Sequence, residues 1–254
     1  RPSMTETRFL TMPDGRKIAH RFLPGKGPAL VFLPGYMSDM AGGKAQAVFD
    51  WAQANGRACL LLDYSGCGES PGQFADGTLS RWRDEVLAVV AAHCAGDVVF
   101  IGSSMGGWMM LLCALALSEQ FGSERVAGLI GIAPAPDFTE WGFTEEQKAV
   151  FRAGGTVYEE NQYGPEPTPT HAGLWADGEN LCLLDTEIPL DCPVRLLHGQ
   201  ADPDVPHEVS LRLAKALRSS DVQVTLIKDG DHRLSREQDI ALLLSTVAGL
   251  AGAS

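Results

Sequence analysis

The sequence has no apolar run close to the roughly 20 residues that a membrane-spanning helix needs. Basic residues are scarce, because 20 Lys and Arg stand against 32 Asp and Glu, which gives a net charge of −12. A chain this acidic repels nucleic acid and anionic membrane surfaces, so we expect no nucleic acid and no membrane as a partner. Internal repeats and low-complexity segments are also lacking. These absences leave an ordinary globular protein.

Cysteine is present but unpaired in the sequence. None of the six cysteines forms a CxxC pair, and Cys59 and Cys113 lie in apolar runs, as buried free thiols do. The N-terminal stretch RPSMTETRF has no signal-peptide core. We therefore expect a reduced, cytoplasmic protein.

Short β-branched or apolar runs alternate with helical patterns along the chain. Eight runs predict strands, at 7–12, 17–23, 28–33, 58–62, 98–101, 129–132, 194–197 and 222–227. Helical patterns lie between them, and we expect Thr78 and Ser235 to cap two of these helices. Alternating strands and helices predict a mostly parallel sheet with helices on both faces, and the opening hairpin around 13–16 predicts an antiparallel edge.

The alternation breaks between about 138 and 190. This stretch holds one helical pattern, at 144–153, and is otherwise rich in Pro, Gly and Tyr. A long insertion of this kind is more often functional than idle. We expect one domain, 1–254, with residues 138–190 inserted as a lid.

The stretch Gly102-Ser103-Ser104-Met105-Gly106 fits G-x-S-x-G. It follows a predicted strand and precedes a long apolar run, which is the strand–turn–helix context of a nucleophile elbow. Such a turn presents its central hydroxyl at a helix N-terminus, where backbone N–H groups favour negative charge. We expect Ser104 to be a nucleophile.

A serine nucleophile needs a histidine base, which follows it and the acid along the chain in this fold class. His232 follows the last predicted strand and is the expected base. His207 begins the next predicted helix and is expected to face away from the elbow. His198, with Gly199, is expected to form a turn.

An acid must hold the histidine in the correct tautomer. Asp202 follows the predicted strand at 194–197 and is the expected acid, with Asp204 two residues further as the nearest alternative. Asp137, after the preceding strand, is a second alternative location. We expect surface or structural roles for Asp204 and Asp137.

The developing oxyanion needs two N–H donors. We expect one from the backbone of Met105, the residue after the nucleophile. The other is expected from the backbone of Tyr36, in the loop after the strand at 28–33, where Gly35 allows a close approach.

Seven of the chain's 19 aromatic residues fall within the expected lid, at 138–175. They predict an apolar wall over the site that would bind an acyl or aryl group, with Trp141 and Phe151 as expected substrate-binding residues. The alternative is that these aromatics form the small core of the lid itself.

The motifs GSSMGG, HGQADPDVP, DGDH and DYSGCGES together resemble the α/β-hydrolase superfamily, over nearly the whole chain. Within it, LPGYMSDM, IGSSMGGWMML, CPVRLLHGQAD and DHRLSREQDI are similar to segments of the mitochondrial palmitoyl-protein thioesterase and acyl-glucuronide esterase group. We expect this chain to lack that group's transit peptide, and it shows no clear match at 154–180. It resembles a bacterial relative.

The resemblance implies an α/β-hydrolase fold with Ser104, Asp202 and His232 as the triad, and no metal or cofactor. The expected substrate is an ester or thioester with an apolar acyl group, carried by a small molecule or by an acylated protein, and cleaved through an acyl-enzyme. The alternatives are a peptidase or C–C hydrolase using the same triad, or a non-catalytic binding protein of the same fold.

Overall fold

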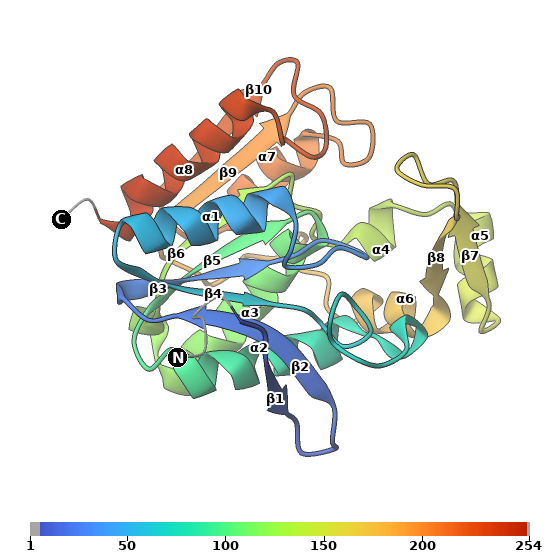
Figure 1. Cartoon of the computed structure of the whole chain (residues 1–254). Coiled ribbons are helices and arrows are strands. Elements are labelled where there is room, and N and C mark those ends of the chain that lie inside the picture. The colour runs from blue at the N-terminus through green and yellow to red at the C-terminus, as the bar shows by residue number, and fades with distance from the viewer. Residues whose placement is uncertain (1–5, 253–254) are drawn as a thin grey trace.

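A computed structural model describes residues 6–252 of the chain (Figure 1). Residues 1–5 and 253–254 lie outside this description, and with them most of the N-terminal stretch in which we expected no signal peptide. An eight-stranded sheet forms the centre of the molecule, in the order β1-β2-β4-β3-β5-β6-β9-β10. A second sheet pairs β7 with β8.

The strands of the large sheet are β1 Arg8–Thr11, β2 Lys17–Leu23, β3 Lys26–Leu33, β4 Arg57–Leu62, β5 Val98–Ser103, β6 Val126–Ile132, β9 Val194–Gly199 and β10 Val222–Ile227. The helices outside the insertion are α1 Gly43–Ala54, α2 Leu79–His93, α3 Met105–Phe121, α7 Glu208–Ala216 and α8 Glu237–Ala251. There are also two short 3₁₀ helices, η1 Phe74–Asp76 and η2 Ser123–Arg125.

Pairing within the large sheet confirms the expected mixture. Strand β1 pairs antiparallel with β2, and β2 pairs antiparallel with β4. From β4 to β10 every neighbouring pair is parallel. Parallel strands connected by helices bring their carboxyl ends to one edge of the sheet, where ligands bind in such folds.

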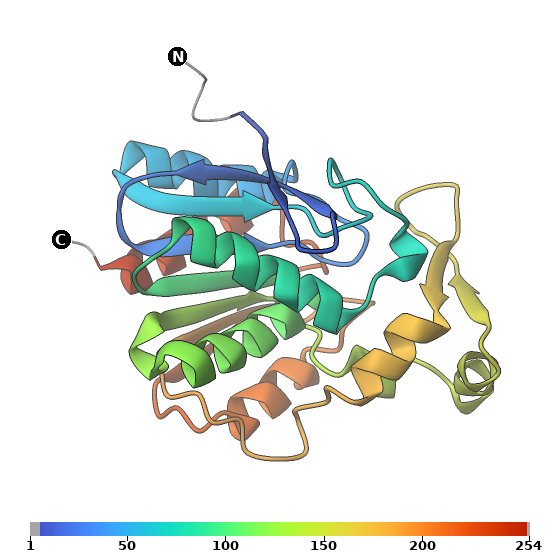
Figure 2. The same ribbon diagram turned by 90° about the horizontal axis from the view of Figure 1, so that it is seen from below.

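Helices cover both faces of this sheet (Figures 1 and 2). Helices α1 and α8 pack on one face, and α2, α3 and α7 pack on the other, each side with its own apolar core. All six residues of β4 and the first five of β5 are buried, which explains why the central strands are nearly continuous apolar runs.

Helix boundaries agree with the sequence at one expected cap and differ at the other. The Thr78 hydroxyl accepts a hydrogen bond from the Arg81 N–H at 3.1 Å, which confirms it as the cap of α2. Ser235 was wrong as a cap, because α8 begins only after Arg236. The Ser235 hydroxyl instead donates to the Arg233 carbonyl at 3.2 Å, and the Asp239 carboxylate accepts from the Arg236 N–H at 3.2 Å.

The segment between β6 and β9 has more structure than its sequence pattern indicated. It contains α4 Phe138–Trp141, α5 Glu145–Arg152, β7 Thr156–Glu159, β8 Thr168–His171 and α6 Ala172–Glu179. The part from α5 to α6 projects from one end of the large sheet, in yellow at the right of Figure 1. Across residues 6–252, no helix is both long and apolar enough to cross a membrane.

Candidate active site

Ser104 lies between β5 and α3. Its backbone has φ 56° and ψ −118°, a conformation that residues other than glycine rarely adopt. Three backbone hydrogen bonds hold it there. Its N–H donates to the Ile132 carbonyl at 2.9 Å, and its carbonyl accepts from Gly107 at 2.8 Å and from Ala135 at 3.0 Å. The conformation is strained, and the hydrogen bonds to the surrounding backbone hold Ser104 in it, as at many functional sites.

Two glycines of the motif are required by space rather than by φ. A Cβ on Gly102 would lie 2.0 Å from the Gly106 carbonyl oxygen, and a Cβ on Gly106 would lie 2.0 Å from the Leu33 carbonyl oxygen. Both contacts are with backbone, so no side-chain movement could relieve them. The elbow therefore packs directly against the end of β3, which explains the glycines of G-x-S-x-G.

Three side chains from the ends of three strands form one hydrogen-bonded chain. His232 Nε2 lies 3.0 Å from the Ser104 Oγ, and His232 Nδ1 lies 2.8 Å from the Asp202 Oδ2. Ser104 follows β5, Asp202 follows β9 and His232 follows β10. The fold thus brings together three residues that are separated by up to 128 positions in the sequence.

The Asp202 carboxylate is held by donors on both oxygens. Its Oδ1 accepts from the backbone N–H of Asp204 at 2.8 Å and of Val205 at 2.9 Å, while its Oδ2 faces His232 and, at 3.4 Å, the Nε2 of His198. Burial acts to raise the pKa of Asp202, but the hydrogen bonds from both histidines and from Val205 outweigh it and hold the pKa well below the usual range. The carboxylate is therefore ionised at neutral pH.

The two alternative carboxylates lie in different surroundings. Asp204 is exposed, and its Oδ2 lies 3.4 Å from the Tyr163 hydroxyl. Asp137 is buried and accepts hydrogen bonds from the N–H of Leu183 and Leu184, at 2.8 and 2.9 Å. Burial raises the pKa of Asp137, and these two N–H groups oppose that shift. Asp137 thus fastens the end of the insertion to the chain after β6.

The expectation of a turn at His198 was wrong. His198 is the fifth residue of β9 and is fully buried, with Ser210 Oγ 2.7 Å from its Nδ1 and the Val205 carbonyl 2.8 Å from its Nε2. Sequence reasoning missed this polar network around Asp202. The spacing of His198 and Asp202, four residues apart at a strand end, was the available signal.

His207 lies at the N-terminal end of α7, with its Nε2 3.6 Å from Glu208.

The loop after β3 lies against Ser104. A Cβ on Gly35 would lie 3.1 Å from the Ser103 carbonyl oxygen, which is a tight contact with backbone, and 3.4 Å from the Ser104 Cβ. Among the described residues, no acceptor pairs with the backbone N–H of Tyr36 or of Met105. The Met105 N–H belongs to the first turn of α3, where helix N–H groups have no partner within the helix.

Two residues that directly follow β4 brace this loop. The Asp63 carboxylate accepts from the Met40 N–H at 2.7 Å and from the Glu69 N–H at 2.9 Å, and the Tyr64 hydroxyl donates to the Pro34 carbonyl at 2.9 Å. Burial raises the pKa of Asp63 despite these two N–H donors. The DYSGCGES turn thus fixes the position of the loop that carries Tyr36.

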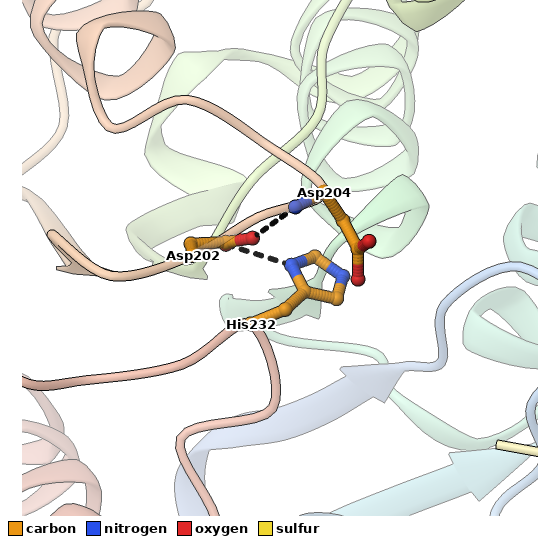
Figure 3. Close-up of side chains that lie close together, drawn as sticks. All are labelled: Asp202, Asp204 and His232. Carbon is orange, nitrogen blue, oxygen red and sulfur yellow. Dashed lines mark hydrogen bonds and ion pairs between the residues drawn. The ribbon is translucent and has the colours of Figure 1, made fainter. Parts of the chain in front are cut away.

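Asp202, Asp204 and His232 also form a group with ligand atoms within 4.8 Å of one another (Figure 3). Such a set can hold a metal ion in principle. Here the Nδ1 of His232 faces Asp202 and its Nε2 faces Ser104, so both ring nitrogens have hydrogen-bond partners. The arrangement fits proton transfer along the ring better than ligation.

The two expected substrate-binding residues, Phe151 and Trp141, pack in different places. Phe151 is buried, stacks on Trp175 at 5.3 Å between ring centroids and meets Phe143 edge-on at 5.0 Å. This packing is that of a small core within the insertion. Trp141 instead packs against Ala135, Val205 and Val209, and Ala135 donates its N–H to the Ser104 carbonyl.

Known proteins resemble the chain over nearly its whole length. The alpha/beta hydrolase family matches residues 30–243. The palmitoyl-protein thioesterase ABHD10 of Homo sapiens, whose name places it in mitochondria, is 37% identical over 97% of this chain and 80% of its own length. The mouse alpha/beta hydrolase domain-containing protein 10 has a TM-score of 0.87 at 37% identity, covering 96% of this chain and 98% of that one.

A bacterial structure is similarly close. The crystal structure of a candidate hydrolase from Agrobacterium vitis S4 has a TM-score of 0.91 at 38% identity, and the match covers 97% of this chain and 99% of that one. The resemblance carried by the sequence motifs is thereby confirmed. The sheet order and the family match agree, and the chain belongs to the alpha/beta hydrolase family.

Proposed function

We propose that this protein is a serine hydrolase that cleaves carboxylic esters or thioesters with an apolar acyl group. The observation that carries the proposal is the hydrogen-bonded chain from Ser104 through His232 to Asp202. A non-catalytic binding protein has no need of this chain or of a strained serine. The ionised Asp202 keeps the proton of His232 on Nδ1, which leaves Nε2 free to accept the proton of Ser104.

The first half of the proposed reaction forms an acyl-enzyme. The Ser104 Oγ attacks the carbonyl carbon while its proton passes to His232 Nε2, and the carbonyl oxygen becomes an oxyanion. The backbone N–H groups of Tyr36 and Met105 are the proposed donors to that oxyanion, since both lie beside Ser104 without another partner among residues 6–252. The imidazolium of His232 then protonates the departing alkoxide or thiolate.

The second half returns the enzyme to its starting state. Water enters as the alcohol or thiol leaves, and His232 accepts its proton while its oxygen attacks the acyl carbon. The Ser104 oxygen then leaves and regains its proton from His232. The products are a carboxylic acid and an alcohol or a thiol, and no group outside this chain is consumed except water.

We infer a lid role for the insertion, within the single domain, from its position beside this site. Trp141 packs against the cluster of Ala135, Val205 and Val209. Within this cluster, Ala135 donates its N–H to the Ser104 carbonyl and Val205 donates its N–H to Asp202. Trp141 is therefore the proposed wall for an apolar acyl group. Phe151 acts on the same pocket through its packing with Trp175, which fixes the insertion's own core.

The substrate proposal covers thioesters because similar proteins are named palmitoyl-protein thioesterases. The acyl group is carried either by a small molecule or by an acylated protein. The cytoplasmic location remains a prediction, supported by six free cysteines, four of them buried. Cell fractionation with a marker for each compartment tests it.

A fluorophosphonate probe tests the nucleophile. We expect labelling of Ser104 in the native protein and no labelling of Ser104→Ala. Ser103→Ala is the matched control, because Ser103 is the adjacent hydroxyl at the end of β5 and has no partner role in the histidine chain. Undiminished labelling of Ser104→Ala would overturn the proposed function.

A further inference from the structure

A second histidine, His198, contacts the proposed catalytic acid from within the sheet. It is fully buried, as is the hydroxyl-bearing Ser210 of α7 beside it. Its Nε2 lies 3.4 Å from the Asp202 Oδ2, and neither His198 nor Ser210 has a part in the proposed reaction. Burying two such polar groups costs free energy unless each is hydrogen-bonded, so their partners define what they do.

The partners of His198 assign its tautomer. Nε2 faces only acceptors, the Val205 carbonyl at 2.8 Å and the Asp202 carboxylate, so Nε2 carries the proton. Nδ1 then accepts a hydrogen bond from the Ser210 hydroxyl at 2.7 Å. A neutral ring with its proton on Nε2 satisfies every group in this network without a buried positive charge.

His198 contacts the Asp202 carboxylate directly and also the loop that holds this carboxylate. The Asp202 Oδ1 is already held by two backbone N–H groups, whereas the Oδ2 has only the side chains of His232 and His198. His198 also holds the carbonyl of Val205, the residue whose own N–H donates to Asp202. Removing the ring would therefore loosen the loop 202–205 and leave the Oδ2 with one donor.

We propose that His198, with its tautomer set by Ser210, is a positioning residue that orients Asp202 toward His232. This role rests on the proposed function, because it acts only through the Ser104–His232–Asp202 chain. His198 shares one N–H between Val205 and Asp202, so the acid keeps the rotamer in which its Oδ2 meets His232 Nδ1. The effect is on the reaction step and not on substrate binding.

Three variants of the full chain test this role. His198→Leu removes the donor, and we expect kcat for p-nitrophenyl butyrate to fall about 10- to 100-fold with KM within twofold, the usual effect of one hydrogen bond to a charged group. His198→Gln places an amide N–H three bonds from Cβ, as far as the Nε2 of histidine, and should recover most of kcat. Ser210→Ala removes the hydroxyl that sets the tautomer of His198 and leaves the contacts of Asp202 in place. It should lower kcat by about three- to tenfold.

The coupling between the two substitutions gives a readout that a simple loss of stability would not give. In the His198→Leu background, Ser210→Ala should cause no further loss of kcat, because the two residues act as one unit.

His20→Leu is the matched control, since His20 is a buried histidine on β2 whose ring contacts are the Ile18 carbonyl and His93. It should lower the unfolding temperature and leave the kcat of the folded protein within twofold. Unchanged kcat in His198→Leu would overturn the positioning role, as would a loss that His198→Gln does not recover. Fluorophosphonate labelling of Ser104→Ala separately tells whether the proposed function itself has failed.

Discussion

The elbow and the insertion are held in place by different kinds of contact. Ser104 is fixed by three backbone hydrogen bonds, and the helix after it is buried along most of its length. The insertion meets the rest of the molecule largely through side chains. Examples are the Trp108 ring N–H on the Leu181 carbonyl at 3.3 Å and the Ser80 hydroxyl on Asp177 at 2.7 Å.

The elbow helix and the insertion also differ in how far their aromatic side chains are exposed. Trp108, in the helix after the elbow, is fully buried, whereas Tyr158 and Tyr163 in the insertion are 65% and 52% exposed. Bond making needs atoms held to within a fraction of an ångström, and backbone contacts in a close-packed core provide this. Substrate selection tolerates movement, so it can reside in a segment that opens at lower free energy.

The largest effect is expected at Asp202, the proposed acid. Asp202→Asn should lower kcat by about 10⁴-fold, the cost of the wrong histidine tautomer in an equivalent triad. Steady-state kinetics on a short ester measures it. Asp204→Asn, at an exposed carboxylate two residues away, should remain within a few-fold of the native enzyme. Equal losses in both variants would contradict the assignment of the acid.

Asp137 fastens the end of the insertion to the chain after β6, so its substitution should lower the stability of the protein rather than kcat. Asp137→Asn converts an acceptor of two backbone N–H groups into one with a single oxygen, and should cost about 1–3 kcal/mol of the free energy of unfolding. Urea denaturation measures this change. The kcat of the folded variant should remain within a few-fold of native, and a crippled kcat would mean that the acid follows β6 rather than β9.

Trp141 tests selectivity in the insertion. Each buried CH₂ is worth about 0.8 kcal/mol, so kcat/KM should rise by about fourfold per CH₂ until the pocket is full. Trp141→Ala should flatten this rise across acetyl, butyryl, octanoyl and palmitoyl esters while acetyl turnover persists, and Phe151→Ala should act likewise by loosening the insertion. Tyr158→Ala, at a largely exposed aromatic, is the control. A native enzyme that prefers acetyl esters would disprove the substrate proposal and leave the triad intact.

The smallest effect expected is at the attachment of the insertion. Asp177 accepts hydrogen bonds from the Ser80 hydroxyl and N–H at 2.7 and 2.8 Å, and so ties α6 to α2. Asp177→Asn should raise KM for an octanoyl ester by about threefold and leave acetyl turnover unchanged. Asp185→Asn is the control, because that carboxylate is 88% exposed and pairs with Arg212 on the surface. An equal change in KM from both variants would argue against an attachment role.

The central strands of the sheet could be predicted because they are buried on both faces. A strand buried on both faces is typically a continuous run of apolar residues, many of them β-branched, as in 98–101, and such runs are visible without any tertiary information. The strands β7 and β8 were not predicted. They carry TVYE and TPTH, which are short, half-exposed and paired only with each other, so their sequence shows no comparable pattern.

The candidate triad could be predicted by order and position along the chain. A serine in a glycine-bounded turn, an acid after one later strand and a histidine after another follow from the local sequence and the rule that parallel strands end at one edge. The surroundings of the acid could not be found in this way. His198 and Ser210 lie 12 residues apart on β9 and α7, and nothing in the intervening sequence indicates that the two side chains meet.

The sequence by itself determined which segments become buried strands and which residue types stand at their ends, because burial and backbone strain are encoded locally by apolar runs and glycines. Only the tertiary structure decided which polar groups share a hydrogen bond. The contact of His198 with Asp202, and the packing of Trp141 against the cluster of Ala135, Val205 and Val209, depend on how helices dock on the sheet. Docking is set by the packing of many side chains at once, which no short stretch of sequence specifies.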